Sequence, residues 1–260
     1  MTTPGDALDE IEVDYARFNA AKTLGTLEPS GFEVERVGGL VATRDRARGD
    51  AYYNRILGVD VANADHVDAA VDWIRAGTGA EKPIRIDIAT GTDPFGEARD
   101  DLVRADTLVW LQHQSPSPLP AASPPTARRL TSDDRPALRE LLTWHGEIAD
   151  DVWDAKQHYL CTADFRWFGV FDGKKLVSAA SIWVHPQAAI FGSGFTVPHA
   201  RGQGHHQRLL ELRLIEVDAL DTVALVDVEP RSQSHRNCLR YGFTELETRE
   251  VWQLADQGRR

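Results

Sequence analysis

Residues 189–210 read AIFGSGFTVPHARGQGHHQRLL, and the interpretation of the whole chain starts from this stretch. Alternation along its first eight residues predicts a β-strand with Gly192 and Gly194 on one face. That face carries no bulky side chain, so a ligand or another backbone can lie against it. Pro198 follows and ends the strand, because proline has no N–H to contribute to a ladder.

A glycine-rich turn, Arg201–Gly204, comes next and opens a predicted helix with Leu210, Leu214 and Val217 on one side. The start of a helix presents free N–H groups and the positive end of the helix dipole, which together bind phosphate. The residues therefore predict a ligand that runs along the strand and ends in a pyrophosphate. An ordinary strand–turn–helix is the alternative, since two glycines near an arginine are common.

The stretch resembles the acetyl-CoA signature of the GNAT superfamily of N-acyltransferases, Arg/Gln-x-x-Gly-x-Gly/Ala after a strand that ends near a proline. Arg201 and Gly204 match this pattern, whereas His206 stands where the family has a small residue. A second block, EPRSQSHRNCLRYGF at residues 229–243, resembles the last helix of the family and its Gly-Phe ending. The two blocks stand in the family's order, and the resemblance covers about residues 127–256.

Composition and charge narrow the class of protein. A chain of 260 residues holds one large domain or two small ones, and 42% hydrophobic with 27% charged residues is typical of a soluble globular protein. No run of eighteen apolar residues predicts a membrane span, and the acidic N-terminus does not resemble a signal peptide. The net charge of −11 argues against nucleic acid as the main partner and weakly favours cationic small molecules, although solubility is the first explanation of this charge. Two cysteines without metal or redox spacing indicate a reducing cytoplasm.

A proline-rich stretch divides the sequence. Residues 115–126 contain five prolines in twelve positions, the composition of a stiff spacer. We therefore expect an N-terminal α/β domain over 1–114, a linker over 115–126 and a GNAT acetyltransferase domain over 127–260. The fold class implied by the resemblance is α/β, with a mixed, largely antiparallel sheet and flanking helices.

The N-terminal half loosely repeats the order of elements of the C-terminal half. Its patterns predict a strand over 33–43, a helix over 65–76 and a further helix over 97–104. It has no Arg-Gly-x-Gly turn, and Asn54–Gly58 resembles a segment of tandem acetyltransferase-like proteins whose first half lacks the cofactor signature. This half is either a degenerate second copy of the GNAT fold or an unrelated α/β domain.

The resemblance implies acetyl-CoA as the cofactor and CoA as the product. It places the thioester carbonyl and the pantetheine arm beside the strand backbone, and the pyrophosphate on the amides of residues 202–207. Two polar positions of the last helix face the cofactor arm. The implied cofactor-binding residues are Phe195, Thr196, Val197, Arg201, Gly202, Gln203, Gly204, His205, His206, Gln207, Ser234 and Asn237.

In this family the substrate amine attacks the thioester directly, so the protein supplies a base and no nucleophile. Glu229 is the first candidate for the base, because it shares a strand face with Asp227 near the expected end of the cofactor. Glu147 and His145 are the next candidates. Cys238 stands where the family has a tyrosine that protonates the leaving thiolate; a thiol can donate a proton, although water is an alternative source.

These observations predict an acetyl-CoA-dependent N-acetyltransferase that acts on a primary amine of a small molecule or peptide. The alternative is a non-catalytic acyl-CoA-binding sensor or scaffold, which the two departures at His206 and Cys238 keep open. We expect no metal, because adjacent histidines on a helix point about 100° apart. We also expect no nucleic-acid or membrane partner, and the sequence leaves the oligomeric state open.

Overall fold

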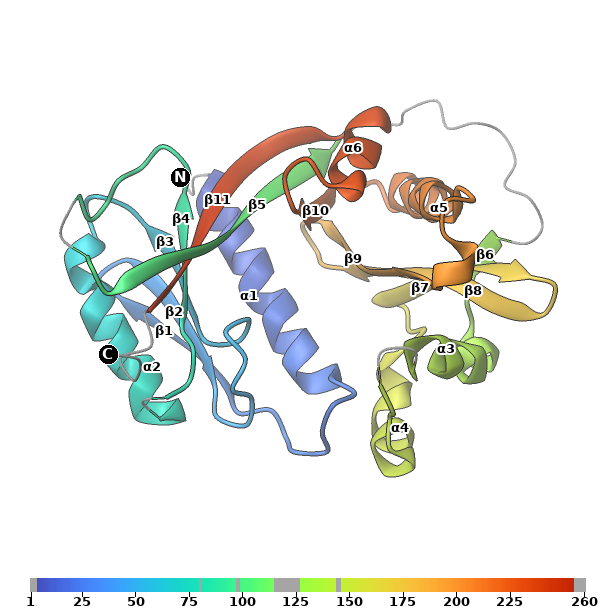
Figure 1. Cartoon of the computed structure of the whole chain (residues 1–260), viewed down its shortest axis with the longest axis horizontal. Coiled ribbons are helices and arrows are strands. Elements are labelled where there is room, and N and C mark those ends of the chain that lie inside the picture. The colour runs from blue at the N-terminus through green and yellow to red at the C-terminus, as the bar shows by residue number, and fades with distance from the viewer. Residues whose placement is uncertain (1–3, 80, 97–98, 115–126, 144–145, 255–260) are drawn as a thin grey trace. The chain divides into compact units, whose positions relative to one another are not determined.

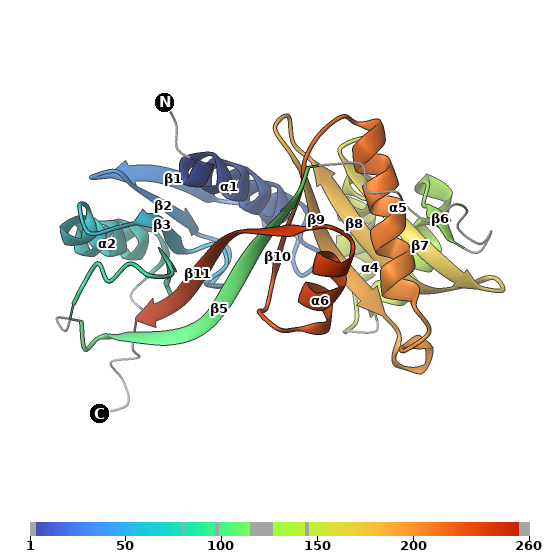
Figure 2. The same ribbon diagram turned by 90° about the horizontal axis from the view of Figure 1, so that it is seen from above.

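The computed structural model describes residues 4–79, 81–96, 99–114, 127–143 and 146–254 (Figures 1 and 2). Contacts within the chain divide it into two compact units. The first unit takes in the chain up to residue 22, residues 28–110 and the chain from residue 246 onward. The second unit takes in residues 23–27 and 111–245, so the chain returns to the first unit at its end.

The first unit is a sheet with a helix on each face. Strands β1, β2 and β3 are antiparallel neighbours, β3 and β4 are parallel with α2 as the crossover, and β4 is antiparallel to β11. These elements are α1 (Pro4–Lys22), β1 (Phe32–Val37), β2 (Leu40–Asp45), β3 (Arg55–Val59), α2 (Val67–Thr78), β4 (Arg85–Ala89), most of β5 (Leu102–His113) and most of β11 (Thr244–Leu254).

Alternation along β2 assigns its side chains to two cores. Leu40 and Ala42 pack with the buried face of α2, whereas Val41, between them, packs with Val13 of α1. Because successive strand residues point to opposite faces, α1 and α2 cover opposite sides of the sheet, as Figure 1 shows. This two-sided burial explains why every residue of β2 is buried.

Two predictions for the first unit are wrong. The single strand expected over 33–43 is a hairpin, because Gly38 and Gly39, at φ values of 58° and 95°, form a tight turn in its middle. The helix expected over 97–104 is replaced, in the described residues 99–104, by a turn and the start of the 12-residue strand β5. Val103, Thr107 and Val109 lie along β5, and their branched side chains favour a strand.

A buried cluster of charges connects α1 to the sheet of the first unit. Glu12 accepts hydrogen bonds from Arg55 at 3.1 Å and from Arg249 at 2.5 Å, and Arg249 also pairs with Asp9 at 2.9 Å. Burial raises the pKa of Asp9 to about 7, against the opposing charge of Arg249. Burial alone would also raise the pKa of Glu12, but Arg249 and Arg55 hold it below its usual value. The pKa values of these two neighbouring carboxylates are therefore shifted in opposite directions.

The raised pKa of Asp9 predicts a pH-dependent stability. The folded chain retains the proton of Asp9 up to about pH 7, whereas the unfolded chain loses it near pH 4, so the free energy of unfolding falls as pH rises between these values. A shift of this size corresponds to at most about 4 kcal/mol. Asp9→Asn should remove that fall, as measured by urea unfolding at pH 4.5 and 7.5. Asp14→Asn is the matched control, because Asp14 is on the same helix with 43% of its side chain exposed. An unchanged pH slope in Asp9→Asn would contradict the prediction.

The second unit contains β6 to β9 as consecutive antiparallel neighbours, and β10 parallel to β9 with α5 as the crossover. In Figure 1, α5 and α6 lie on one face of these strands and α3 and α4 on the other, and Figure 2 shows α5 running across β7, β8 and β9. The elements are β6 (Ala127–Arg129), α3 (Arg135–Leu142), α4 (Asp150–Lys156), β7 (Phe165–Asp172), β8 (Lys175–Val184), β9 (Ala189–Thr196), α5 (His205–Ala219), β10 (Ala224–Val228) and α6 (Gln233–Arg240). Among the described helices, none has the length and apolar character needed to span a membrane.

Both units contain the same succession of pairings. Three antiparallel strands, β1 to β3 or β7 to β9, lead through a crossover helix to a parallel fourth strand. The predicted linker over 115–126 lies outside the described residues, and the predicted domain boundaries remain a prediction. Residues 246–254 of β11 belong to the first unit, where residues 249–253 pair with β4.

Candidate cofactor site

Strand β9 has an open edge beyond its first residues. Its parallel pairing with β10 is confined to Ala189 and Ile190. At Ser193 the φ value is 50°, and the register between β9 and β8 shifts in the same region, so the strand departs from regular pleating there. A Cβ atom on Gly194 would meet nothing within 4 Å. The strand therefore offers exposed backbone to a ligand at the place that the glycines predict.

The turn from Arg201 to Gly204 connects β9 to α5. Gly202 and Gly204 have φ values of 77° and 80°, which residues with side chains rarely adopt. The Nε of Arg201 donates to the carbonyl of Thr196 at 3.2 Å and ties the turn to the end of the strand. Within the described residues, no side chain caps the start of α5, and its first turn holds no acidic residue. The first N–H groups of α5 are thus left for an anionic ligand.

Helix α6 carries the polar residues that face α5. Ser232 caps α6 by accepting the N–H of His235 at 3.0 Å. The buried side chain of Asn237 lies 3.0 Å from Nδ1 of His206 on α5. Burial, with a smaller contribution from the charge of Arg213, lowers the pKa of His206 to about 4, so its imidazole is neutral at physiological pH. The family's small residue is therefore replaced by a neutral ring hydrogen-bonded to α6.

These elements enclose a pocket of about 390 Å³, a size typical of small-molecule sites. The predicted cofactor-binding residues that line it are Thr196, Arg201, Gly202, Gly204, His205, His206, Gln207 and Asn237. Ala200 and Gln233 complete the lining. The composition suits a diphosphate, because helix N–H groups and an arginine face it and no carboxylate is among the lining residues.

The other predicted cofactor residues lie around this pocket. Gln203 lines a second hollow of about 380 Å³, on the side of the turn toward the end of β7. The carbonyl of Phe195 accepts the hydroxyl of Ser178 at 2.9 Å. Val197 is buried and donates its N–H to the carbonyl of Val177 at 3.0 Å, so that N–H is already bonded within the sheet. Ser234 hydrogen-bonds Cys238.

The structure does not bring the two predicted catalytic residues into the pocket lining. Glu229 follows β10 and is exposed. Cys238 is 2% exposed, and burial raises the pKa of its thiol. The hydroxyl of Tyr241 donates to Glu211 at 2.6 Å, and burial together with this bond raises the pKa of Tyr241 to about 12. Of the other base candidates, Glu147 is exposed and His145 lies outside the described residues.

The first unit has a different turn at the corresponding place, between β3 and α2. The carboxylate of Asp60 accepts the N–H groups of Ala62 at 2.8 Å and Asn63 at 3.1 Å. Asp65 and Asp68 stand in the first turns that follow. These amides are already bonded, and the surrounding negative charge repels phosphate. This described turn therefore lacks the open N–H groups found at the start of α5.

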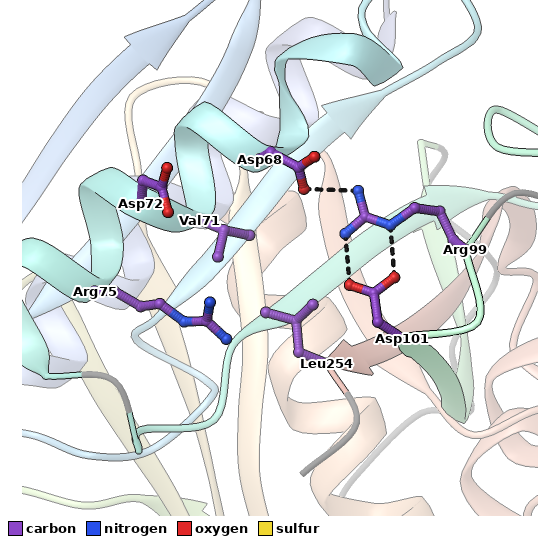
Figure 3. A pocket seen from close by; sticks show the side chains of 7 residues that line it. All are labelled: Asp68, Val71, Asp72, Arg75, Arg99, Asp101 and Leu254. Atoms are coloured by element: carbon purple, nitrogen blue, oxygen red, sulfur yellow. Dashed lines mark hydrogen bonds and ion pairs between the residues drawn. The ribbon is translucent and has the colours of Figure 1, made fainter. Parts of the chain in front are cut away.

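A smaller pocket of about 120 Å³ lies beside α2 in the first unit (Figure 3). Arg99 pairs with both oxygens of Asp101, at 2.7 and 2.9 Å, and with Asp68 at 2.8 Å. Arg75 extends from α2 toward Leu254 in this view. Three carboxylates, those of Asp68, Asp72 and Asp101, line the pocket with the two guanidinium groups, so the pocket is unsuited to phosphate. The ion pairs of Arg99 instead connect α2 to the chain before β5.

The order of elements and the pocket at the start of α5 define the class of protein: the chain has the GNAT acetyltransferase fold, as the resemblance implied. Solved structures with this fold confirm it. A GCN5-related N-acetyltransferase from Kribbella flavida matches with a TM-score of 0.62 and 13% identity over 95% of this chain and 96% of that one. Another from Sphaerobacter thermophilus matches with a TM-score of 0.60 and 13% identity over 92% and 90%. A GNAT-family acetyltransferase from Colwellia psychrerythraea matches with a TM-score of 0.55 and 12% identity over 98% of each chain.

No family model and no curated relative matches the sequence. At these low identities the structural similarity establishes the fold. The similarity is not limited to the second unit, because each of the three structures covers more than nine-tenths of this chain.

Sequence reasoning missed part of the pocket. Gln233 lines it, and its position four residues before Asn237 on one helix face was the available signal. Arg208 and Glu211, which form an ion pair beside the second hollow, were also missed. Their i,i+3 spacing is common on solvated helices, so the pattern alone does not mark a site.

Proposed function

We propose that the chain is an acetyl-CoA-dependent N-acetyltransferase that transfers an acetyl group to a primary amine of a small molecule or peptide. The observation that carries this proposal is the pocket at the uncapped start of α5, beside the open edge of β9. Acetyl-CoA, when bound, supplies an acetyl group activated as a thioester. The net charge of −11 further favours cationic amines as acceptors.

Different residues of the second unit have different proposed roles in cofactor binding and proton transfer. The N–H groups of His205, His206 and Gln207 would hold the pyrophosphate of acetyl-CoA, and the exposed backbone of β9 around Gly194 would orient its pantetheine arm. Glu229, at the end of β10, would accept a proton from the ammonium group of the substrate, which leaves the neutral amine as the nucleophile. Cys238 is not a nucleophile, because its buried thiol stays protonated at neutral pH. The proton that the leaving thiolate needs would come from water.

The first unit, in this proposal, is a degenerate copy of the same fold that has lost the cofactor site. Its succession of strand pairings supports a duplication. Asp60, which occupies the amides before α2, supports the loss of phosphate binding. The compact units interleave along the chain, so truncation at the proline-rich stretch would remove β11 from the first unit. Binding experiments therefore use the intact chain.

A thiol-release assay with acetyl-CoA across a panel of amines, aminoglycosides and peptides tests the activity. Acceptor-dependent release of CoA is the expected result. A non-catalytic acyl-CoA-binding protein is the second candidate, favoured because Glu229 and Cys238 are absent from the described pocket lining. Calorimetric binding of CoA without release for any acceptor would support this second candidate. Failure to bind CoA would contradict both.

A further inference from the structure

Three side chains of α6 form a hydrogen-bonded relay that ends at His206. Arg236 donates from Nη2 to Oε1 of Gln233 at 3.0 Å. The Nε2 of Gln233 donates to Oδ1 of Asn237 at 3.0 Å, and Nδ2 of Asn237 lies 3.0 Å from Nδ1 of His206. Gln233, Asn237 and His206 all line the candidate cofactor pocket.

The chemistry of arginine sets the direction of this relay. A guanidinium group only donates hydrogen bonds, so the atom of Gln233 that faces Arg236 must be the amide oxygen. The amide nitrogen of Gln233 then faces Asn237, which must present its oxygen to Gln233 and its nitrogen to His206. An amide nitrogen is also only a donor, so Nδ1 of His206 accepts.

A neutral imidazole with an accepting Nδ1 carries its proton on Nε2. The lowered pKa of His206 keeps the ring neutral at physiological pH, because burial and the nearby Arg213 disfavour a second proton. Among the described residues, Asn237 is the one side chain that hydrogen-bonds the ring of His206. The Nε2–H group is therefore left for a ligand of the pocket that His206 lines.

We propose that the Arg236–Gln233–Asn237 relay holds His206 in the Nε2–H form, and that this N–H donates to a phosphoryl oxygen of the bound cofactor. This inference rests on the proposed function. The family pattern has a small residue at this position, which lets the backbone approach the ligand closely but offers no side-chain donor. His206 would instead bind the ligand through its ring. The anionic oxygen gains a neutral donor beside the N–H groups at the start of α5.

The tautomer is measured first, in the intact protein with nitrogen-15-labelled histidine. Imidazole nitrogen shifts of His206 should report the Nε2–H form at neutral pH. Gln233→Glu should convert it to the Nδ1–H form, because a carboxylate accepts from Asn237 and turns the asparagine oxygen toward His206. Gln187→Glu adds the same charge at an exposed turn and should leave the tautomer unchanged. An Nδ1–H wild type, or an unchanged tautomer in Gln233→Glu, would overturn the relay.

Calorimetry with CoA then tests the contact to the ligand. His206→Leu, which retains bulk and removes the donor, should weaken CoA binding by about 10- to 100-fold, the usual range for a hydrogen bond to a charged group. His206→Gln should restore most of the affinity, because its amide N–H reaches the position of Nε2. Wild-type binding by His206→Leu would overturn the contact while leaving the proposed function intact. A wild type that binds no CoA would overturn the proposed function and, with it, the contact.

Discussion

Gly204→Glu should abolish CoA binding to the intact chain, with a loss of affinity greater than about 100-fold. Gly204 has a φ value of 80° and lies directly before the first residue of α5. A glutamate there places a carboxylate among the N–H groups proposed to hold the pyrophosphate, so like charges repel and the amides gain an internal acceptor. Isothermal titration calorimetry with CoA measures the effect.

The control must reproduce the backbone strain without touching the pocket. Gly91→Glu does so, because Gly91 has a φ value of 89° in the first unit and a Cβ atom there would meet nothing within 4 Å. It introduces the same side chain, the same charge and a similarly unfavourable φ value. CoA affinity should be unchanged in Gly91→Glu. Equal affinities in the two variants would place the cofactor elsewhere and remove the main support for the proposed function.

Glu229→Gln should lower the turnover rate by roughly 10²- to 10⁴-fold, the usual contribution of a positioned general base. Glu229 follows β10 and is exposed, so an amine from solvent can reach it, and the substitution removes the proton acceptor while preserving size. CoA affinity should change little, because Glu229 is absent from the described pocket lining. Initial-rate kinetics with any accepted amine, paired with CoA calorimetry, separate these two effects.

Two control variants test whether the loss of turnover is specific to Glu229. Asp227→Asn removes a carboxylate from the same face of β10 and should cost far less, which excludes a general effect of charge. Cys238→Ala should also cost much less, since the thiol is buried and absent from the described pocket lining, and water can protonate the leaving group. Near-normal turnover in Glu229→Gln would assign the base to another residue, and Glu147, exposed before α4, is the next to substitute.

The glycine turn before α5 was predictable because its requirements are local. A proline that cannot extend a ladder, glycines that tolerate positive φ and a helix with a regular apolar spacing all act within a few residues. The hairpin between β7 and β8 was predictable for the same reason, since Gly173 takes a φ value of 58° in the Asp-Gly turn. Gly38 and Gly39 of the β1–β2 turn carried the same signal, although the strand-like residues on both sides favoured one continuous strand.

The walls of the pocket depend on pairs that are distant in sequence. His206 meets Asn237 across 31 residues, and the relay behind it requires two helices to lie side by side. His206 lines the candidate cofactor pocket, but its hydrogen-bond partner was not predicted from the sequence. The catalytic roles of Glu229 and Cys238 stay predictions. Glu229 is exposed and Cys238 is buried, and residue type alone does not determine either degree of burial.

By itself, the sequence determined the fold class of this protein and the position of its candidate cofactor turn. Backbone sterics and side-chain periodicity depend only on residues that are close together in the sequence. Only the tertiary structure decided which strands and charges meet. Residues 249–253 of β11 pair with β4, and Arg249 reaches Glu12 across 237 positions of sequence. Such pairings depend on the free energy of burying two surfaces or two charges against each other. Each segment of sequence supplies only one of the two partners, so neither segment determines the pairing alone.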